Sequence, residues 1–493
     1  MIRSGRDYIS NLSKNSPRVY YDGRLVDDVT RDAAFKPAIE AVSGYYDMQF
    51  SEKGGRLSAV NPAIGDSSGI SFITPTDKDG LARLGAALNE IYSKNNGLVG
   101  RGPVFLNMFL MLFNAHADEY AEQGKDRYAE NIRNIYREAA KQDLFHTHAI
   151  IAPAYDRMRP PSKWEKQDMQ AGVAKETGEG LVIKGAAMLA TAGPYAERIL
   201  YTPNTRRDSS DRYLVYFSVP TNTKGISFVS RREFGPRNGT GRFEYPISST
   251  YAESDAMVVY DNALIPWDRV IAYGDADAIA KFRWDTVQLR TWWNWHMVIQ
   301  NTAKIRFLAG LAISVSEALG IDGFVNVQEK LGEILIYLSI GESAMASSIE
   351  KGEQLDAIYR PNRQISSATA YMNTKAIPRI NEILRQLPGG ASIPIPATIK
   401  DFSNPEELAM LEMYLGVKGA GAVERAKLFN VYWDVIASEN GMRNEQYDRF
   451  NLGDPTRKWA ALYTDEFKER KGDYKKLVKE LMDSMPSPED VGD

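Results

Sequence analysis

The sequence predicts a mainly α-helical protein with a central β region. Helical periodicity runs through the first part of the chain, short β-branched runs without long helices between them follow, and helical periodicity then returns. We therefore expect an N-terminal helical domain at 1–148, a middle β-barrel domain at 149–274 and a C-terminal helical bundle with a tail at 275–493. At roughly 150 residues per domain, the chain is long enough for three. Because helices and strands lie in separate blocks, a fold of alternating βα units is disfavoured.

Two segments carry the helical signal of the first part. In segment 81–92 (LARLGAALNEIY) the apolar residues recur at spacings of three and four, which predicts an amphipathic helix. Segment 107–117 (NMFLMLFNAHA) is apolar nearly all round, which predicts a helix buried in the core.

The middle region reads as strands. Its apolar runs are short, rich in β-branched and aromatic residues, and bounded by Pro, Asn, Gly and Asp. They stand at 178–191, 213–219, 225–229 and 256–260. Strands this close together are typical of a barrel or a sandwich.

Amphipathic helices resume in the last part of the chain. We expect them at 305–319, 327–338, 406–415 and 423–436, with a Pro- and Gly-rich loop at 387–396 between the second and third. The charged end, 468–493, predicts a helix with a frayed tail.

Composition excludes several classes of function. The 60 basic and 64 acidic residues leave a net charge of −4, which does not favour binding to nucleic acid or to anionic membranes. The absence of cysteine excludes disulfides, a catalytic thiol, thiolate zinc sites and Cys-ligated iron–sulfur clusters. The four histidines form no HExxH motif. No signal-peptide core and no apolar run of about 18 residues is present, so a cytoplasmic location is expected.

Three motifs have both a structural and a functional interpretation. The glycine cluster at 416–421 is interpreted as a tight helix entry, the alternative being a close approach to a cofactor pyrophosphate. His146 and His148 would share one face of a strand, but no carboxylate nearby completes a metal site, so no metal is expected. Trp292, Trp293 and Trp295 form a core or interface cluster, or else an aromatic wall beside a planar ligand.

The order of helices, strands and helical bundle is typical of the acyl-CoA dehydrogenase-like flavoprotein fold. Within that order the sequence resembles the large oxygenase component of the 4-hydroxyphenylacetate 3-monooxygenase family, which includes chlorophenol monooxygenases. The resemblance is carried by RSGRDYISNL (3–12), GRGP (100–103), QDL (142–144), THA (147–149), RPP (159–161), VIKGA (182–186), AT (190–191), VPTNT (219–223), VYDNALIPWDRV (259–270), VQEK (327–330), GMR (441–443) and NLGDP (451–455).

The resemblance implies the oxygenase component of a two-component monooxygenase. Such an enzyme receives FADH2 from a separate NAD(P)H:flavin reductase and uses molecular oxygen as co-substrate. It hydroxylates a phenolic ring, ortho to the hydroxyl, through a flavin C4a-hydroperoxide. The resemblance also implies a homotetramer. The sequence leaves open which phenol is used, whether the product is a catechol or a dehalogenated quinol, and which reductase takes part.

The resemblance also implies site residues. Arg101 and His148 match the catalytic Arg and His that face the substrate hydroxyl and the flavin. A histidine titrates near neutrality, so His148 could accept the hydroxyl proton or donate a hydrogen bond. Substrate-binding positions are Phe105, Asn204 and Thr205. Cofactor-binding positions are His148, Ala152, Pro153, Ala154, Tyr155, Thr191, Gly441, Met442, Arg443 and Asn444.

Three positions depart from the family pattern. Phe105 stands where the family has a phenol-binding Tyr, which removes a hydroxyl donor from the substrate pocket. Asn204 replaces a Ser, and Ala152-Pro153-Ala154 replaces Asn-Pro-Gln. The first two changes bear on the identity of the substrate.

Two other functions remain as alternatives. One is an acyl-CoA dehydrogenase-like flavin dehydrogenase, although no Glu in the sequence is singled out as its base. The other is a non-enzymatic helical scaffold. A relative on the same fold, 4-hydroxybutyryl-CoA dehydratase, needs a Cys-ligated cluster that a chain without cysteine cannot build.

Overall fold

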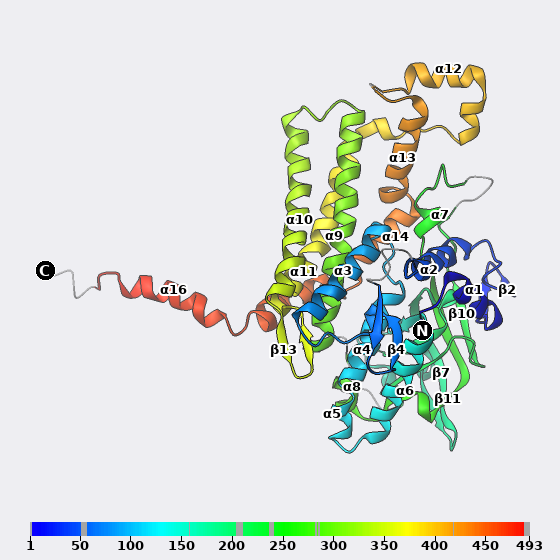
Figure 1. The fold of residues 1–493 in the computed structure, drawn as a ribbon, viewed down its shortest axis with the longest axis vertical. Coiled ribbons are helices and arrows are strands. Elements are labelled where there is room, and N and C mark those ends of the chain that lie inside the picture. Colours follow the sequence, from blue (N-terminus) through cyan, green and yellow to red (C-terminus); the bar gives the residue numbers. More distant parts are fainter. Residues whose placement is uncertain are drawn as a thin grey trace.

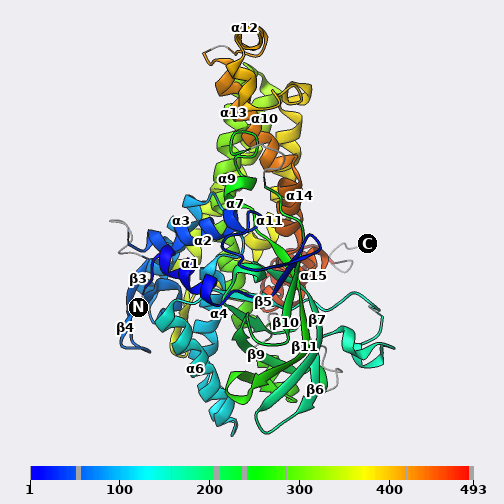
Figure 2. The same cartoon turned by 90° about the vertical axis from the view of Figure 1, so that its right-hand side faces the viewer.

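The computed structural model describes residues 2–50, 57–156, 158–203, 211–235, 241–281, 283, 286–417 and 419–487. The strands gather at one end of the molecule with the N-terminal helices beside them, and the long C-terminal helices extend from that end as a bundle (Figures 1 and 2). The last helix projects away from the body (Figure 1). The predicted fold class, helices followed by a β region and a helical bundle as in acyl-CoA dehydrogenase-like flavoproteins, is confirmed.

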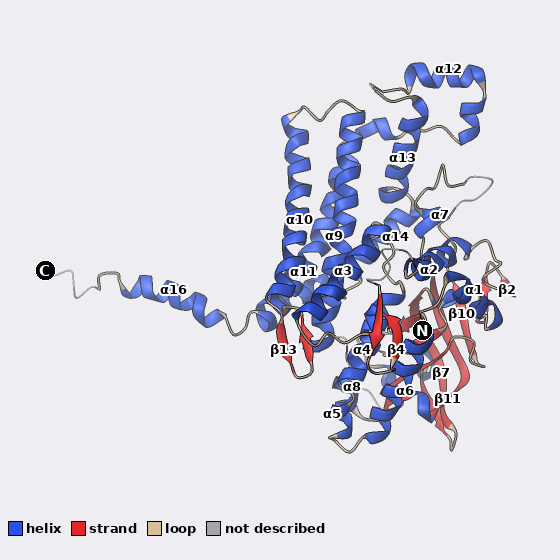
Figure 3. Ribbon diagram, viewed as in Figure 1, coloured by secondary structure: helices blue, strands red, loops and turns tan. Residues whose placement is uncertain are grey.

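The N-terminal part is mostly helical (Figure 3). The predicted helices at 81–92 and 107–117 correspond to α3 and α4. Helix α4 begins at Gly102, its N-cap, with Pro103 in the first turn, where a missing backbone N–H costs nothing. It is buried on nearly every side, as its composition predicts. The elements of this part are α1 (Gly5–Lys14), α2 (Lys36–Met48), the hairpin β3 (Ser58–Asn61) and β4 (Asp66–Gly69), α3 (Lys78–Lys94), α4 (Pro103–Ala115), α5 (Asp118–Ala121) and α6 (Asp126–Gln142).

The β region, predicted as a barrel, is built from two sheets. The aromatic rings of Tyr201 and Phe217 on one sheet pack against Tyr260 on the other. In sheet order, the larger comprises β2 (Arg24–Val26), β1 (Val19–Tyr21), β10 (Ile226–Ser230), β11 (Asp255–Pro266), β7 (Gly180–Thr191) and β6 (Gly172–Glu176). The smaller comprises β12 (Val270–Tyr273), β9 (Val215–Pro220), β8 (Arg198–Tyr201) and β5 (His146–Ala149).

The N-terminal segment takes part in both sheets. Strand β1 pairs in parallel with β10, and β5 pairs in parallel with β8, opposing His148 to Leu200. The start of β5 is fixed by Glu197, whose carboxylate accepts the Phe145 N–H and pairs with Arg3. Strand β5 therefore crosses the expected boundary between residues 148 and 149. The three-domain division stays a prediction.

The bundle consists of long helices, as expected from 305 onward. Inside it, Lys304 on α9 and Asp448 on α14 form a buried ion pair with an N–O distance of 2.7 Å. The bundle and its neighbours comprise α8 (Ala276–Lys281), α9 (Val287–Ala318), α10 (Val325–Glu350), the hairpin β13 (Glu353–Leu355) and β14 (Ile358–Arg360), α11 (Arg363–Gln386), α12 (Pro405–Tyr414), α13 (Ala422–Ile436), α14 (Glu439–Phe450), α15 (Pro455–Ala461) and α16 (Lys471–Asp483). The short helix α7 (Ser248–Tyr251) precedes β11 and packs on α2. Across the described ranges, no helix combines the length and apolarity needed to cross a bilayer.

Asp143 is a buried acid whose ionisation bears on the stability of the fold. It ends α6 in the left-handed conformation (φ 51°), and its Oδ2 accepts a hydrogen bond from the Gln49 side-chain amide. Burial raises its pKa above the ordinary value of 3.8. An acid whose pKa is higher in the folded state opposes folding at pH values above that pKa, and the penalty vanishes below the unfolded-state value.

We therefore expect Asp143→Asn to raise the thermal unfolding midpoint at pH 7. Asn adopts the left-handed conformation readily and keeps an oxygen for Gln49. The gain should shrink as the pH falls through the raised pKa of the folded carboxyl toward the ordinary value of 3.8. Scanning calorimetry of both proteins across this pH range measures the difference. A variant less stable than wild type at pH 7 would contradict the assignment.

Candidate active site

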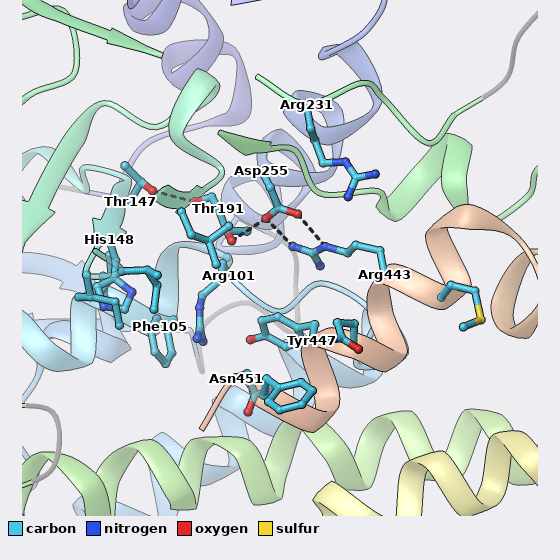
Figure 4. Close-up of a pocket in the computed structure, with 18 of the residues that line it drawn as sticks. Arg101, Phe105, Thr147, His148, Thr191, Arg231, Asp255, Arg443, Tyr447 and Asn451 are labelled. Carbon is cyan, nitrogen blue, oxygen red and sulfur yellow. Dashed lines mark hydrogen bonds and ion pairs between the residues drawn. The ribbon is translucent and has the colours of Figure 1, made fainter. Parts of the chain in front are cut away.

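A cavity of about 680 Å³ lies where the β region meets the helices. The N-terminal turn of α4, strand β5 and the ends of β7 and β11 form part of its wall, and helices α9 and α14 form the rest. Figure 4 shows side chains from these elements converging on one space. The lining residues are Arg101, Gly102, Phe105, Leu106, His146, Thr147, His148, Ile150, Ile151, Leu189, Thr191, Arg231, Arg232, Asp255, Trp293, Ala437, Ser438, Glu439, Met442, Arg443, Gln446, Tyr447, Phe450 and Asn451.

Arg443 ties the helical side of the cavity to the sheet side. Its Nε and Nη2 donate to the two carboxylate oxygens of Asp255 at 3.0 and 2.8 Å, and its Nη1 donates to Glu253 at 2.8 Å. The guanidinium is buried, and its two carboxylate partners hold the pKa of Arg443 well above its ordinary value. Its positive charge is thus fully matched by protein groups.

Arg101 is held differently. Its backbone N–H donates to the Glu253 carboxylate at 2.6 Å. Its guanidinium carbon lies 4.0 Å from the ring centre of Phe105, 5.4 Å from that of Trp293 and 5.2 Å from that of Tyr447. Cations are attracted to such ring faces. Its Nη1 is buried and has no hydrogen-bond partner among the described residues.

His148 lies on β5, beside this aromatic group. Its ring centre is 6.2 Å from those of both Phe105 and Trp293. Burial, and then the positive charge of Arg101, lower the pKa of His148 well below 6.5. The expectation that it titrates near neutrality is corrected: an apolar surrounding and a neighbouring cation both oppose its protonation. The imidazole is neutral at pH 7.

The ends of β7 and β11 are joined by side-chain hydrogen bonds at the cavity wall. The Thr191 hydroxyl donates to Asp255 at 2.7 Å, and the Thr147 hydroxyl donates to the Thr191 carbonyl at 2.7 Å (Figure 4). Asp255 therefore receives both Thr191 and Arg443, and these contacts hold its pKa below the ordinary value although burial opposes this.

Comparisons with known proteins match the whole of this architecture. Residues 4–272 match the family described as 4-hydroxyphenylacetate 3-hydroxylase N terminal, and residues 282–483 match its C-terminal counterpart. The 4-hydroxyphenylacetate 3-monooxygenase oxygenase component of Thermus thermophilus is 34% identical over 480 residues, which cover 95% of this chain and 96% of that protein.

The chain belongs to the 4-hydroxyphenylacetate 3-hydroxylase family.

Further relatives agree with this assignment to the hydroxylase family. A probable 4-hydroxyphenylacetate 3-monooxygenase of Bacillus subtilis is 29% identical, covering 94% of this chain and 95% of that protein. A crystal structure of an oxygenase component of 4-hydroxyphenylacetate 3-monooxygenase complexed with FAD matches with a TM-score of 0.90 at 32% identity, over 98% of this chain and 99% of that one. An archaeal 4-hydroxybutyryl-CoA dehydratase from N. maritimus, 18% identical with a TM-score of 0.85 over 99% and 96% of the chains, shares the fold.

The structure brings together six of the residues predicted from the hydroxylase-family resemblance. They line the one cavity although they come from four parts of the chain. They are Arg101, Phe105, His148, Thr191, Met442 and Arg443. Asn204 and Thr205, predicted to bind substrate, lie outside the described residues.

The four residues predicted to bind the flavin after β5, Ala152 to Tyr155, lie outside the lining of the main cavity. Ile151, just before them, lines the main cavity, whereas Pro153, Ala154 and Tyr155 line a separate open hollow on the outer face of β7 and β11. Ala152 lies between the two, in the lining of neither. The backbone turns outward here because Met188 on β7 donates its N–H to the Ile151 carbonyl.

The predicted C-terminal turn, 441–444, is also divided. Met442 and Arg443 line the cavity, but Gly441 packs on the backbone of Val435, where an added Cβ would lie 2.4 Å from the carbonyl oxygen. Asn444 is buried and accepts a hydrogen bond from Arg443 at 3.3 Å. Gly441 thus permits the close approach of α14 to the end of α13.

The tryptophan cluster, the histidine pair and the glycine cluster can now be placed in the structure. Trp293 lines the cavity, whereas Trp292 and Trp295 are fully buried in the core. His146 and His148 both line the cavity, and the described residues contain no cluster of three groups able to hold a metal. The glycine cluster leads into α13, where the Ala422 N–H donates to the Glu412 carboxylate, so an acid and not a phosphate occupies this helix start.

Sequence reasoning missed Glu253, Asp255, Arg231 and Tyr447. Tyr447 carried a usable signal, because it follows Arg443 by four residues and so shares a helix face with it. Glu253 and Asp255 gave none, since acids before a strand are common and their partner is almost two hundred residues away.

We expect removal of the Arg101 charge to raise the pKa of His148. In Arg101→Met the burial contribution stays and the electrostatic one is lost, so the pKa should rise without reaching 6.5. Arg101→Lys, which keeps the charge, is the matched control. The chain has only four histidines, so NMR titration of labelled imidazoles, with His148→Asn for assignment, can follow this one. Equal pKa values in wild type and Arg101→Met would contradict the expectation.

Proposed function

We propose that the chain is the oxygenase component of a two-component, FADH2-dependent monooxygenase that hydroxylates a phenolic ring, ortho to its hydroxyl. The observation that carries the proposal is the guanidinium of Arg101, which is fixed over three aromatic rings with one buried nitrogen left to bind an anion inside the cavity. Family membership and relatives described with bound FAD support the cofactor.

The cavity residues fit a flavin. Leucine, isoleucine and methionine side chains offer apolar surface to a planar ring system, and they come from both sides of the space: Ile150, Ile151, Leu189 and Met442. Arg231 lies at the cavity edge (Figure 4), and no described acid forms an ion pair with it, so it is suited to the cofactor's phosphates. Reduced FAD, when bound, would supply the activation of molecular oxygen.

The predicted cofactor residues have four roles under this proposal. His148, Thr191 and Met442 would contact the flavin, and Arg443 would hold the wall on which it rests. Gly441 and Asn444 would act through the shape of α14. Pro153, Ala154 and Tyr155 would continue the binding surface outward along the outer face of the sheet, and Ala152 would connect them to Ile151.

Arg101 would bind the substrate as a phenolate. A phenol has a pKa of about 10, and a neighbouring guanidinium favours its anion. The anion carries more electron density at the ortho carbon, which is the carbon that must receive oxygen. Nη1 of Arg101 is already desolvated, so no water has to be removed from it when the anion binds.

His148 would position the same oxygen by a hydrogen bond. With a pKa well below neutrality it is a weak base, so it is unsuited to storing the phenol proton between steps. Its neutral ring still offers one N–H and one lone pair. We therefore assign the charge to Arg101 and the orientation to His148. Phe105 and Trp293 would exclude water from this end of the cavity.

The dehydrogenase alternative lacks a base. The carboxylates among the described lining residues are Asp255 and Glu439, and both are ion-paired, with Arg443 and Arg232. Arg443 helps to hold the pKa of Asp255 below its ordinary value, and a carboxylate engaged by an arginine is poorly placed to abstract a substrate proton.

A separate reductase must supply the reduced flavin, and we propose that the oxygenase assembles as a homotetramer. Helix α16 projects from the body (Figure 1) with a face of exposed apolar residues at spacings of three and four. They are Tyr474, Leu477, Val478, Leu481 and Met482. A second exposed apolar stripe, Leu335, Ile336 and Ile340, runs along α10. A second copy of the chain would cover surfaces of this kind.

Arg101→Met should lower the yield of hydroxylated product per FADH2 oxidised. Loss of one preorganised donor to a developing or bound oxyanion costs about 10²–10³-fold in rate. The test mixes protein and FADH2 without oxygen, adds oxygen and a panel of phenols, and measures product and hydrogen peroxide. Arg101→Lys should retain part of the yield. Unchanged yield in Arg101→Met would refute the assignment, and a wild type that binds no reduced FAD would refute the function.

Leu481→Glu should weaken the assembly, because it places a charge in the apolar face of α16. Lys479→Glu, on the opposite face of the same helix, is the matched control and should leave the mass unchanged. Light scattering coupled to size exclusion measures both. A wild-type mass of one subunit would overturn the proposed tetramer.

A further inference from the structure

A second, smaller cavity of about 180 Å³ lies behind the loop that carries Arg101. It is enclosed by α2, α3, the first turn of α4 and α7. Its lining residues are Ala41, Val42, Gly44, Tyr45, Met48, Ile91, Tyr92, Lys94, Asn95, Val99, Gly102, Pro103, Val104 and Tyr251.

The interior of this second cavity is mostly apolar in spite of its tyrosines, and its polar exception is the Asn95 side chain, whose Oδ1 is buried with no hydrogen-bond partner among the described residues. The Tyr45 hydroxyl is engaged by Ser71, and that of Tyr92 pairs with His296 Nε2 at 2.5 Å. Both tyrosines therefore offer only ring surface to the cavity. Lys94 is exposed, and the Tyr251 hydroxyl donates to its carbonyl at 3.5 Å, which keeps this polar group at the rim.

The second cavity lies between the protein surface and the segment that carries Arg101. Gly44, on α2, is exposed and marks its outer end. Gly102 lines both cavities and marks its inner end. An ideal Cβ at Gly102 would meet only Val99, at 3.9 Å, so the space beside this residue is open. Next to it, Arg101 presents its guanidinium to the main cavity.

We propose that the second cavity is a binding site for dioxygen, and its route to the active site. The inference rests on the proposed function, which requires dioxygen beside the flavin. An apolar diatomic molecule gains by leaving water for an apolar space. A charged phenol would lose its hydration there without compensation, and a flavin is too large for 180 Å³.

The separation of the two routes has a chemical consequence. The main cavity would be filled by cofactor and substrate when the reaction begins, so a path through it would be blocked. The second cavity opens on the opposite side of the Gly100–Arg101–Gly102 segment, which Tyr447 and Glu253 hold through the Gly100 carbonyl and the Arg101 N–H. Dioxygen could thus arrive beside Arg101 without displacing either ligand.

Gly44→Phe tests the proposal. A Cβ at Gly44 meets no atom within 4 Å, and the position is helical, so the variant should fold and its ring should fill the outer end of the cavity. Gly44→Ala is the matched control, because it adds helix propensity and almost no volume. Crystals of wild type and Gly44→Ala pressurised with xenon should show the gas in this cavity, and crystals of Gly44→Phe should not.

The second measurement mixes the anaerobic complex of protein and reduced FAD with oxygenated buffer in a stopped-flow instrument. The bimolecular rate constant for oxygen should fall severalfold in Gly44→Phe and stay unchanged in Gly44→Ala, with equal affinity for reduced FAD in all three. If Gly44→Phe excludes xenon from the cavity but reacts with oxygen as fast as the wild type, the proposed route is wrong. If wild-type crystals show no xenon in the cavity, the proposed site is wrong. Failure of the wild type to bind reduced FAD would instead overturn the proposed function.

Discussion

The cavity exists because Arg443 holds the helical bundle against the sheet. Arg443 comes from α14, and its partners Glu253 and Asp255 stand at the start of β11, almost two hundred residues earlier. Glu253 also accepts the backbone N–H of Arg101, so one buried carboxylate joins the loop before α4, the sheet and α14. A buried ion pair contributes little net stability when complete, but leaves a costly charge when one partner is removed. Its effect is thus to fix one relative placement of three segments.

The two cavity arginines differ because their partners differ. Arg443 faces two carboxylates that match its charge, whereas Arg101 faces aromatic rings, which attract a cation without accepting its N–H groups in the plane. The rings fix the position of the guanidinium and leave its charge to act on whatever lies in the cavity. The same charge acts on His148 and helps to keep it neutral.

The sequence carried most of the fold, because its patterns are local. The apolar periodicity of α3 and the β-branched runs of β7 and β11 each predict the position of their element to within a few residues. The hairpin of β1 and β2 was missed although Asp22-Gly23, a strong turn signal, lies between the strands, both residues with positive φ. Strands of three residues are short for a periodicity argument, and β1 is stabilised by pairing with the distant β10.

Only those site residues that lie in recognisable sequence motifs could be predicted from the sequence. Arg101, His148 and Thr191 stand in blocks that resemble the family, and the cavity contains all three. Their roles depend on neighbours that no local pattern reveals. The burial that lowers the pKa of His148 comes from packing against Phe105 and Trp293, which are far apart in sequence.

Phe105, where the resemblance to the family predicts a tyrosine, bears on these roles. Its ring lies under the Arg101 guanidinium and edge-on to Trp293 and His296, contacts that a tyrosine ring could make equally well. The change therefore preserves the placement of the charge and removes a hydroxyl. The hydroxyl of Tyr92 is already paired with His296, which itself contacts the Phe105 ring, and it is no substitute. A phenolate in this cavity would then depend for its hydrogen bonds on the guanidinium of Arg101 and the imidazole of His148. Loss of either group should matter more in this chain than in its Phe105→Tyr variant.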